Sequence, residues 1–216
     1  MFKWIALLLG VPIAVVILEL LAVTWIESLQ ARQLASRQPE VNPRDEARTA
    51  VVYFSRSGNT ALAARQIARH LDARLFALEA PAYSLGLSGL LHALKDAYRL
   101  KERAGALPQI NPSDIDLASF DTVWLGSPVW LYSPAPPLWS FVEHNRFDDQ
   151  HIVLFNTYNS NFGDEHIEKL KAKLMARGAR SFEHRHIQRG RMGRQTPPEQ
   201  MLQAIEEQWF NGQTSP

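Results

Sequence analysis

The sequence contains no cysteine. Disulfides, cysteine nucleophiles, thiolate zinc sites and cysteine-ligated iron–sulfur clusters are therefore excluded. An excess of either charge is also absent, because 23 lysine and arginine residues balance 22 aspartate and glutamate residues to a net charge of +1. Nothing in this balance indicates a nucleic-acid partner, and we expect none. The Walker A ending GK[ST] and the dinucleotide fingerprint GxGxxG are missing as well.

Charge is almost absent from the first 26 residues. Residues 4–26, WIALLLGVPIAVVILELLAVTWI, contain one charged side chain, Glu19. A helix of this length spans roughly 35 Å, enough for a hydrocarbon core of about 30 Å. Trp4 and Trp25 lie near its ends, where indole rings favour the membrane interface. A cleaved signal peptide is the alternative, but its apolar region is usually shorter and ends in small residues. We therefore predict an uncleaved anchor that contacts the lipid bilayer through residues 4–26.

Basic residues near this segment predict its orientation. One precedes the segment and four follow it: Lys3 before it, and Arg32, Arg37, Arg44 and Arg48 after it. The positive-inside rule then places the C-terminal body in the cytoplasm, with a single crossing of the inner or plasma membrane. Glu19 either snorkels or protonates near one end of the span, or it marks a helix contact or a proton or quinone site.

Predicted strands alternate with predicted helices from residue 49 onward. We expect strands at 49–55, 73–80, 122–126, 151–157 and 180–188, and helices at 60–71, 87–105, 138–145, 164–177 and 197–210. This alternation predicts an α/β domain with a parallel sheet and helices on both faces. We thus divide the chain into a transmembrane helix at 1–30, a linker at 31–48 and one domain at 49–216.

The loops that follow the first, third and fourth strands are the candidate site. In an open parallel sheet, ligands bind beyond the carboxyl ends of the strands. The first loop, SRSGNT at 55–60, opens a helix, whose unpaired N–H groups favour an anion. Its hydroxyls and amide add neutral donors, and Gly58 permits a close approach. This inventory suits a phosphate, although a simple helix cap would use the same residues.

The other two loops suit a flat ring. The loop at 126–137, GSPVWLYSPAPP, presents Trp130 between prolines that restrict its backbone. It either stacks against a planar ligand or packs under the body of the domain. The loop at 156–163, NTYNSNFG, is rich in amides that could bind the polar edge of a heterocycle.

Phosphate, planar ring and polar edge together describe flavin mononucleotide (FMN), and the chain resembles the flavodoxin-like family from about residue 49 to its end. VYFSRSGNT resembles that family's phosphate loop, VWLGSPVW its second flavin loop, and FNTYNSNFG stands where its third should be. The resemblance implies a doubly wound five-stranded parallel sheet of order 2-1-3-4-5. It also implies an outward-pointing Arg56, because the family holds the phosphate with neutral donors. The implied FMN contacts are Ser55, Ser57, Gly58, Asn59 and Thr60 for the phosphate, Pro128, Val129 and Trp130 for the ring, and Thr157, Tyr158, Asn159 and Gly163 for the ring edge.

Three functions follow from this resemblance. The first is an FMN-dependent oxidoreductase that takes electrons from NAD(P)H or a reductase and reduces a quinone, with a tetrapyrrole as another substrate class in the family. The second is a one-electron carrier, which is typically strongly acidic. Without Lys3, Glu19 and Glu27, this chain keeps 22 basic and 20 acidic residues, which disfavours a carrier. The third is an interaction module without flavin.

Two further groups of residues are considered. His184 and His186 alternate on a predicted strand, but no third ligand is apparent, so we expect no metal and place them at an edge or surface. The basic stretch Arg185, Arg189, Arg191 and Arg194 is a solvated loop, a contact with anionic lipid headgroups, or a site for a pyridine-nucleotide phosphate.

Overall fold

The computed structural model describes residues 2–37, 41, 46–102, 107–190 and 194–211. Its elements in chain order are α1 (Phe2–Ala35), β1 (Thr49–Phe54), α2 (Asn59–His70), β2 (Arg74–Leu78), η1 (Pro81–Tyr83), α3 (Leu87–Glu102), β3 (Thr122–Trp130), β4 (Ser133–Pro134), α4 (Pro136–His144), β5 (His151–Tyr158), α5 (Asp164–Ala176), β6 (Ser181–Gln188), α6 (Pro198–Ile205) and η2 (Glu206–Phe210).

The sheet has the predicted topology. Its order is β2-β1-β3-β5-β6, and all four pairings along this path are parallel. This is the expected order 2-1-3-4-5, with the two-residue β4 added antiparallel to β3. Because the strands are parallel, the residues that follow β1, β3, β5 and β6 all lie at one edge of the sheet.

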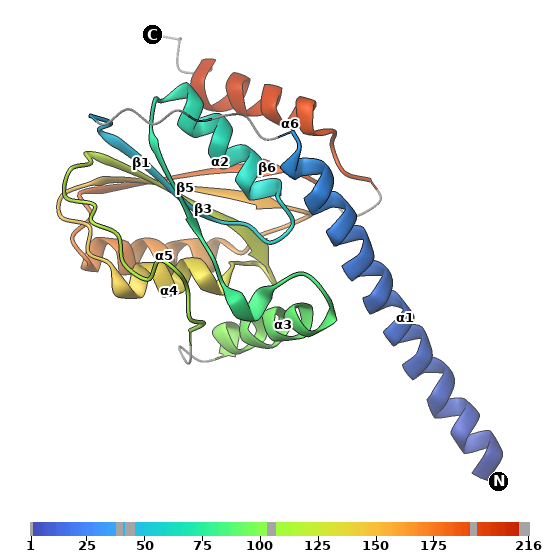
Figure 1. Ribbon diagram of the computed structural model, residues 1–216. Coiled ribbons are helices and arrows are strands. Elements are labelled where there is room, and N and C mark those ends of the chain that lie inside the picture. The colour runs from blue at the N-terminus through green and yellow to red at the C-terminus, as the bar shows by residue number, and fades with distance from the viewer. Residues whose placement is uncertain (1, 38–40, 42–45, 103–106, 191–193, 212–216) are drawn as a thin grey trace.

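Helices cover both faces of this sheet (Figure 1). Alternate residues of a strand point to opposite faces. Val52, Leu125 and Leu154 therefore lie in the core shared with α4 and α5. Val51 and Val153 point to the other face, where α2 and α6 cover them. The hydrophobic strands are buried on both sides, as expected for a doubly wound sheet.

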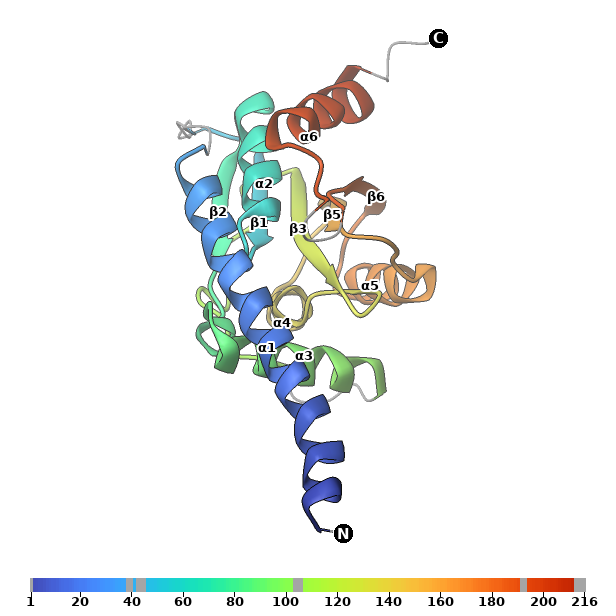
Figure 2. The same cartoon turned by 90° about the vertical axis from the view of Figure 1, so that its right-hand side faces the viewer.

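The N-terminal helix has one exposed part and one packed part. Within the described residues, Val11–Ala35 is the one helix long and apolar enough, by length and composition, to cross a membrane. Its N-terminal part projects away from the body in both views (Figure 1, Figure 2), and Leu18 is 66% exposed. Further along, Thr24, Glu27 and Leu34 are buried, so their shared side of the helix contacts the body. The helix therefore continues through 31–35, where we expected a linker to begin; residues 38–40 and 42–45 of that linker lie outside the described residues.

Helix α3 buries its small residues and exposes its large ones. Ala93 and Ala97 are each 3% exposed, and they face the body. Leu91, Leu94 and Tyr98, which their spacing places on one side of the helix, are among the exposed large hydrophobic residues. An apolar helical stripe normally faces the core, so this one requires an explanation beyond the folding of the domain.

Candidate functional site

The loop between β1 and α2 forms the floor of the site. Gly58 precedes α2 with a φ of +93°, a conformation that favours glycine. A Cβ atom at this position would lie 3.0 Å from the Cβ of Leu34 in α1, so the space around it is also restricted. The Gly58 N–H donates to Ser55 Oγ at 3.2 Å, which closes the loop. The first N–H groups of α2 have no partner within their helix and are available to an anion.

A pocket that is partly open to solvent lies above this loop. Ten of the twelve residues predicted to contact a cofactor line it: Ser55, Ser57, Asn59, Thr60, Pro128, Val129, Trp130, Thr157, Tyr158 and Asn159. The other two are glycines outside this lining. Gly58 lies beneath Leu34, and the Gly163 N–H donates to the carbonyl oxygen of Tyr132 at 2.8 Å. The structure thus brings all three predicted loops together at one pocket.

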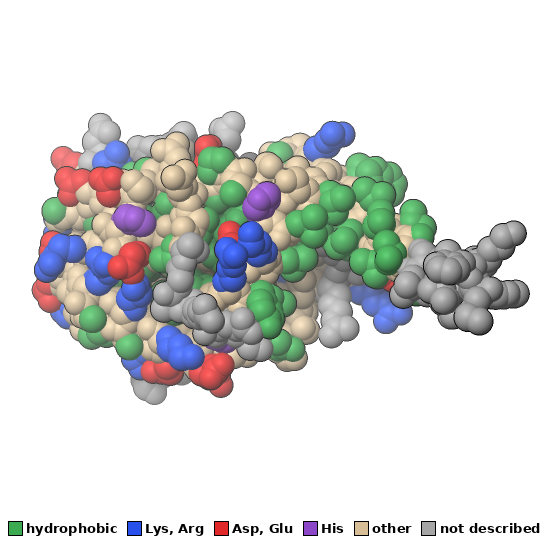
Figure 3. All heavy atoms as spheres, turned by 90° about the horizontal axis from the view of Figure 1, so that it is seen from below, with side chains coloured by type: hydrophobic (Ala, Val, Ile, Leu, Met, Phe, Trp, Pro, Cys, Tyr) green, Lys and Arg blue, Asp and Glu red, His purple; other side chains and the backbone are tan. Residues whose placement is uncertain are grey.

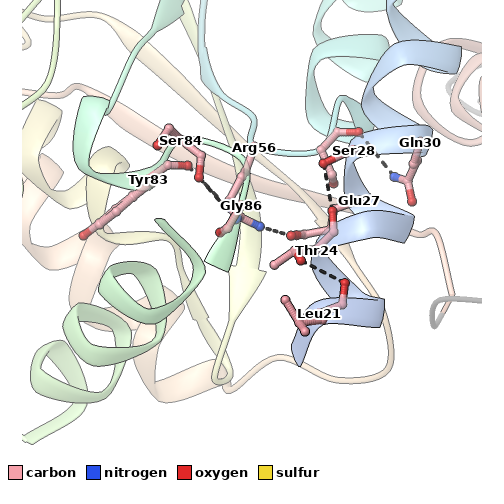
Figure 4. Close-up of polar contacts among 10 residues, drawn as sticks. Leu21, Thr24, Glu27, Ser28, Gln30, Arg56, Tyr83, Ser84 and Gly86 are labelled. Carbon is pink, nitrogen blue, oxygen red and sulfur yellow. Dashed lines mark hydrogen bonds and ion pairs between the residues drawn. The ribbon is translucent and has the colours of Figure 1, made fainter. Parts of the chain in front are cut away.

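Helix α1 supplies a wall of this pocket that the sequence did not indicate. Glu27 and Gln30 line it, and Gln30 Nε2 donates to the carbonyl oxygen of Ser57 at 3.3 Å (Figure 4). Helix α1 and the domain are therefore joined at the site itself.

Arg56 does not point outward, as the family resemblance implied. Its side chain is 4% exposed and forms an ion pair with Glu27 of α1 (Figure 4). Its guanidinium also donates to the carbonyl oxygens of Tyr83, Ser84 and Gly86 at 3.2–3.3 Å. The expectation was wrong because it did not take α1 into account. The carboxylate of Glu27 in α1 pairs with the guanidinium, which therefore points into the protein. Arg56 thus connects the phosphate loop to α1 and to the segment that precedes α3.

Arg189 is a site residue that the sequence analysis left among several alternatives. It follows β6, lines the pocket and is 4% exposed. Its Nε donates to Asn59 Oδ1 at 3.0 Å, whereas its Nη1 has no hydrogen-bond partner among the described residues. Burial lowers the pKa of this guanidinium. A buried cationic nitrogen without a partner is costly, and a bound anion would satisfy it. The position of Arg189 directly after β6 could have indicated that it binds a ligand, because β6 and β1 end at the same edge of the sheet.

Buried polar groups hold the loops in register. Thr60 Oγ1 and Thr157 Oγ1 lie 2.8 Å apart, which joins the first loop to the third. Asn156 Nδ2 donates to the carbonyl oxygen of Ser127 at 2.9 Å, which joins the third loop to the second. His184 Nε2 lies 2.9 Å from Asn156 Oδ1. Burial, and then the neighbouring His186, lower the pKa of His184 to about 4. The neutral ring therefore donates Nε2–H to the amide oxygen and fixes its orientation.

The second loop is a hairpin rather than an irregular proline-rich loop. β3 continues to Trp130, and β4 pairs back onto it. Leu131 and Tyr132 connect them with φ values of +47° and +74°, the left-handed conformations that a two-residue turn requires. The Trp130 ring makes edge contacts with Phe54 and Tyr83 at centroid distances of 5.6 and 5.7 Å. This indole is held in place and still borders the pocket.

The other candidate groups lie elsewhere. Among the described residues, no group of three or more His, Asp or Glu side chains could hold a metal. His184 is half-buried within its strand, whereas His186 is exposed. Arg185 donates to Glu183 and lies over the Trp124 ring, Arg194 is exposed, and Arg191 lies outside the described residues.

The inventory of this pocket fits FMN. A helix N-terminus, hydroxyl and amide donors and the unsatisfied Nη1 of Arg189 suit a phosphate. The backbone at Pro128 and Val129 and the Trp130 ring suit a planar ring. The fold and the site together define a flavodoxin-like α/β protein.

Comparison with known proteins agrees with this class. Residues 48–195 match the model of the flavodoxin family, and the chain belongs to that family. None of the curated proteins compared with the chain matches it.

Solved structures share the fold. A flavoprotein of Bacteroides uniformis ATCC 8492 is 20% identical, with a TM-score of 0.57 over 75% of this chain and 99% of that one. A flavoprotein of Lactobacillus acidophilus NCFM in complex with FMN is 19% identical, with a TM-score of 0.55 over 64% and 93%. A flavoprotein of Bacteroides eggerthii DSM 20697 is 19% identical, with a TM-score of 0.53 over 74% and 96%.

Proposed function

We propose that this chain is an FMN-dependent oxidoreductase anchored by α1 to the inner or plasma membrane, where it reduces a quinone at the cytoplasmic face. NAD(P)H or a reductase supplies the electrons. One observation supports this proposal above the others. Glu27 and Gln30, just beyond the apolar segment 4–26, line the same pocket as the predicted FMN contacts. An acceptor dissolved in the bilayer could then reach the site without crossing the cytoplasm.

The residues of the pocket have distinct roles in this proposal. The N-terminus of α2 would hold the phosphate, with Ser55, Ser57 and Asn59 as neutral donors and Arg189 as the charged one. The Thr60–Thr157 hydrogen bond supports the loop beneath them. Residues 128–130 would hold the flavin ring, and residues 157–159 would contact its polar edge. When bound, FMN supplies the electron-transfer chemistry, and the protein orients it and restricts access to it.

The carrier remains the alternative proposal. It would need two well separated one-electron potentials, whereas an enzyme that reduces a quinone needs transfer of two electrons. The near-neutral charge of the chain disfavours a carrier. The interaction module without flavin is disfavoured by the unsatisfied cationic nitrogen of Arg189 in the pocket.

A reoxidation experiment tests the proposed acceptor. The full chain is reconstituted with FMN in liposomes that do or do not contain a long-chain quinone. The flavin is reduced with dithionite, and its absorbance is then followed over time. We expect rapid return of the oxidised spectrum when the liposomes contain a long-chain quinone, and slow return in liposomes without it. Equal rates with and without the quinone would argue against the proposal. Two separate potentials in a reductive titration would favour the carrier.

A further inference from the structure

Helix α3 carries an apolar stripe that is largely exposed. The stripe consists of Leu87, Leu91, Leu94 and Tyr98. The last three follow Leu87 by four, seven and eleven positions, so all four share one side of the helix. Leu91 is 49% exposed, Leu94 42% and Tyr98 54%. The body is contacted instead by the alanines of the helix. The four side chains therefore contribute little to the core of the domain.

The position of this stripe relative to α1 indicates what covers it. Arg56 pairs with Glu27 of α1 and donates to the carbonyl oxygen of Gly86, which immediately precedes α3. The start of α3 is thus at the level of Glu27, where the apolar segment of α1 has just ended. Trp25, 67% exposed, and Leu85, 43% exposed, lie at this same level. Aromatic and apolar side chains at this height are typical of a membrane interface.

The shape of the molecule agrees with this placement. α3 lies on the side of the body toward which the N-terminal part of α1 projects (Figure 1, Figure 2). From that side, hydrophobic side chains cover the described part of α1 and continue onto the body, with lysine and arginine side chains beside them (Figure 3). Lys95 and Arg99 are exposed, one position beyond Leu94 and Tyr98 in the helix.

We infer that α3 is an interfacial helix, which lies in the plane of the membrane with its apolar stripe in the acyl–headgroup boundary. An apolar stripe flanked by basic side chains is the pattern of helices that lie on a bilayer containing anionic lipids. The inference rests on the membrane anchoring proposed above, and it adds a second membrane contact. Together the two contacts would fix the tilt of the domain and hold the pocket mouth beside the lipid surface.

Site-specific fluorescence tests this inference in the full chain. Because the sequence has no cysteine, a single one can be introduced and labelled with an environment-sensitive dye. The sites are Leu94→Cys on the stripe, Leu18→Cys in the apolar segment, and Gln203→Cys, an exposed position on α6 at the opposite side of the body. The protein is reconstituted in phosphatidylcholine vesicles with a minority of phosphatidylglycerol, with and without bromine atoms on the acyl chains.

We expect the brominated lipid to quench the dye most at position 18, less at 94 and not at 203. Adding Leu91→Ser should reduce the quenching at 94, whereas Ser88→Asn, on the polar side of α3, should leave it unchanged. Quenching at 18 but not at 94 would overturn the interfacial helix while leaving the anchor intact. No quenching at 18 would contradict the anchor itself. A dye at 94 that is shielded only at high protein density, without lipid quenching, would identify a second copy of the chain as the partner instead.

Discussion

The pocket and the surface formed by α1 and α3 depart from ordinary folding in opposite ways. Around the pocket, polar and charged side chains are buried, among them Arg56, Arg189 and Thr60. On the α1–α3 surface, large apolar side chains such as Leu18 and Leu94 are exposed. Buried polar groups and exposed apolar patches are the observations that indicate function rather than folding. We attribute the first to the proposed anionic ligand and the second to the proposed contact with a lipid surface.

The largest loss of stability should occur when a buried charge beside the pocket loses its partner. Glu27→Ala leaves the buried guanidinium of Arg56 without its carboxylate, so we expect the free energy of unfolding in detergent to fall by about 3 kcal/mol. Urea titration of the full chain measures this change. Arg37→Ala, which removes an exposed pair with Glu199, is the matched control and should cost less than about 1 kcal/mol. Similar costs for the two variants would contradict the linking role of Arg56.

Arg189 tests whether the buried charge serves the ligand. Arg189→Gln should weaken FMN binding by roughly 30-fold, or about 2 kcal/mol, because it removes a charge-assisted hydrogen bond to the phosphate. Arg194→Gln removes an exposed arginine of the same basic stretch and should have little effect. Fluorescence titration of the apoprotein measures both affinities. If Arg189→Gln bound FMN as tightly as the wild type, its guanidinium would have no part in binding the phosphate.

His184 gives the buried network a pH dependence. Its pKa is about 4 in the folded protein and about 6.5 in the unfolded chain, which therefore binds the proton more readily as the pH falls through this window. Stability should decrease by about 2 kcal/mol between about pH 7 and pH 5 because of this one side chain, and it should be almost unaffected by this group above pH 7. His184→Gln keeps a donor for Asn156 and should make stability nearly independent of pH between about pH 7 and pH 5. If stability fell as steeply in this variant, His184 would be excluded as the source of the pH dependence.

The smallest effect on stability is expected on the apolar surface. Leu94→Ser should change the free energy of unfolding in detergent by less than about 0.5 kcal/mol, because the side chain is 42% exposed and contributes little to the core. Ile67→Ala, on the buried face of α2, should cost about 3 kcal/mol by comparison. Urea titration distinguishes these outcomes. A large loss for Leu94→Ser would mean that α3 contributes its stripe to the fold after all.

Much of the fold follows from the sequence because its signals are local. The alternation of strands and helices predicted a parallel sheet, and the family resemblance carried by the SRSGNT and GSPVW loops implied its strand order, which is confirmed. The same loops supplied predicted residues that line one pocket. What the sequence does not encode locally is the pairing of distant segments. The contact of Glu27 with Arg56 spans 29 residues, and that of Arg189 with Asn59 spans 130. The spacing of Leu91, Leu94 and Tyr98 likewise places them on one side of α3, but it does not indicate whether protein or lipid covers that side.

The central claim is that the pocket at the end of α1 binds a flavin through its phosphate. The most direct test is to titrate the flavin-free full chain with FMN and with riboflavin, which lacks the phosphate, and to follow flavin fluorescence. The donors at Ser57, Asn59, Arg189 and the start of α2 predict that FMN binds at least roughly 100-fold more tightly, or about 3 kcal/mol. Equal affinities for the two flavins, or no binding of either, would contradict the account.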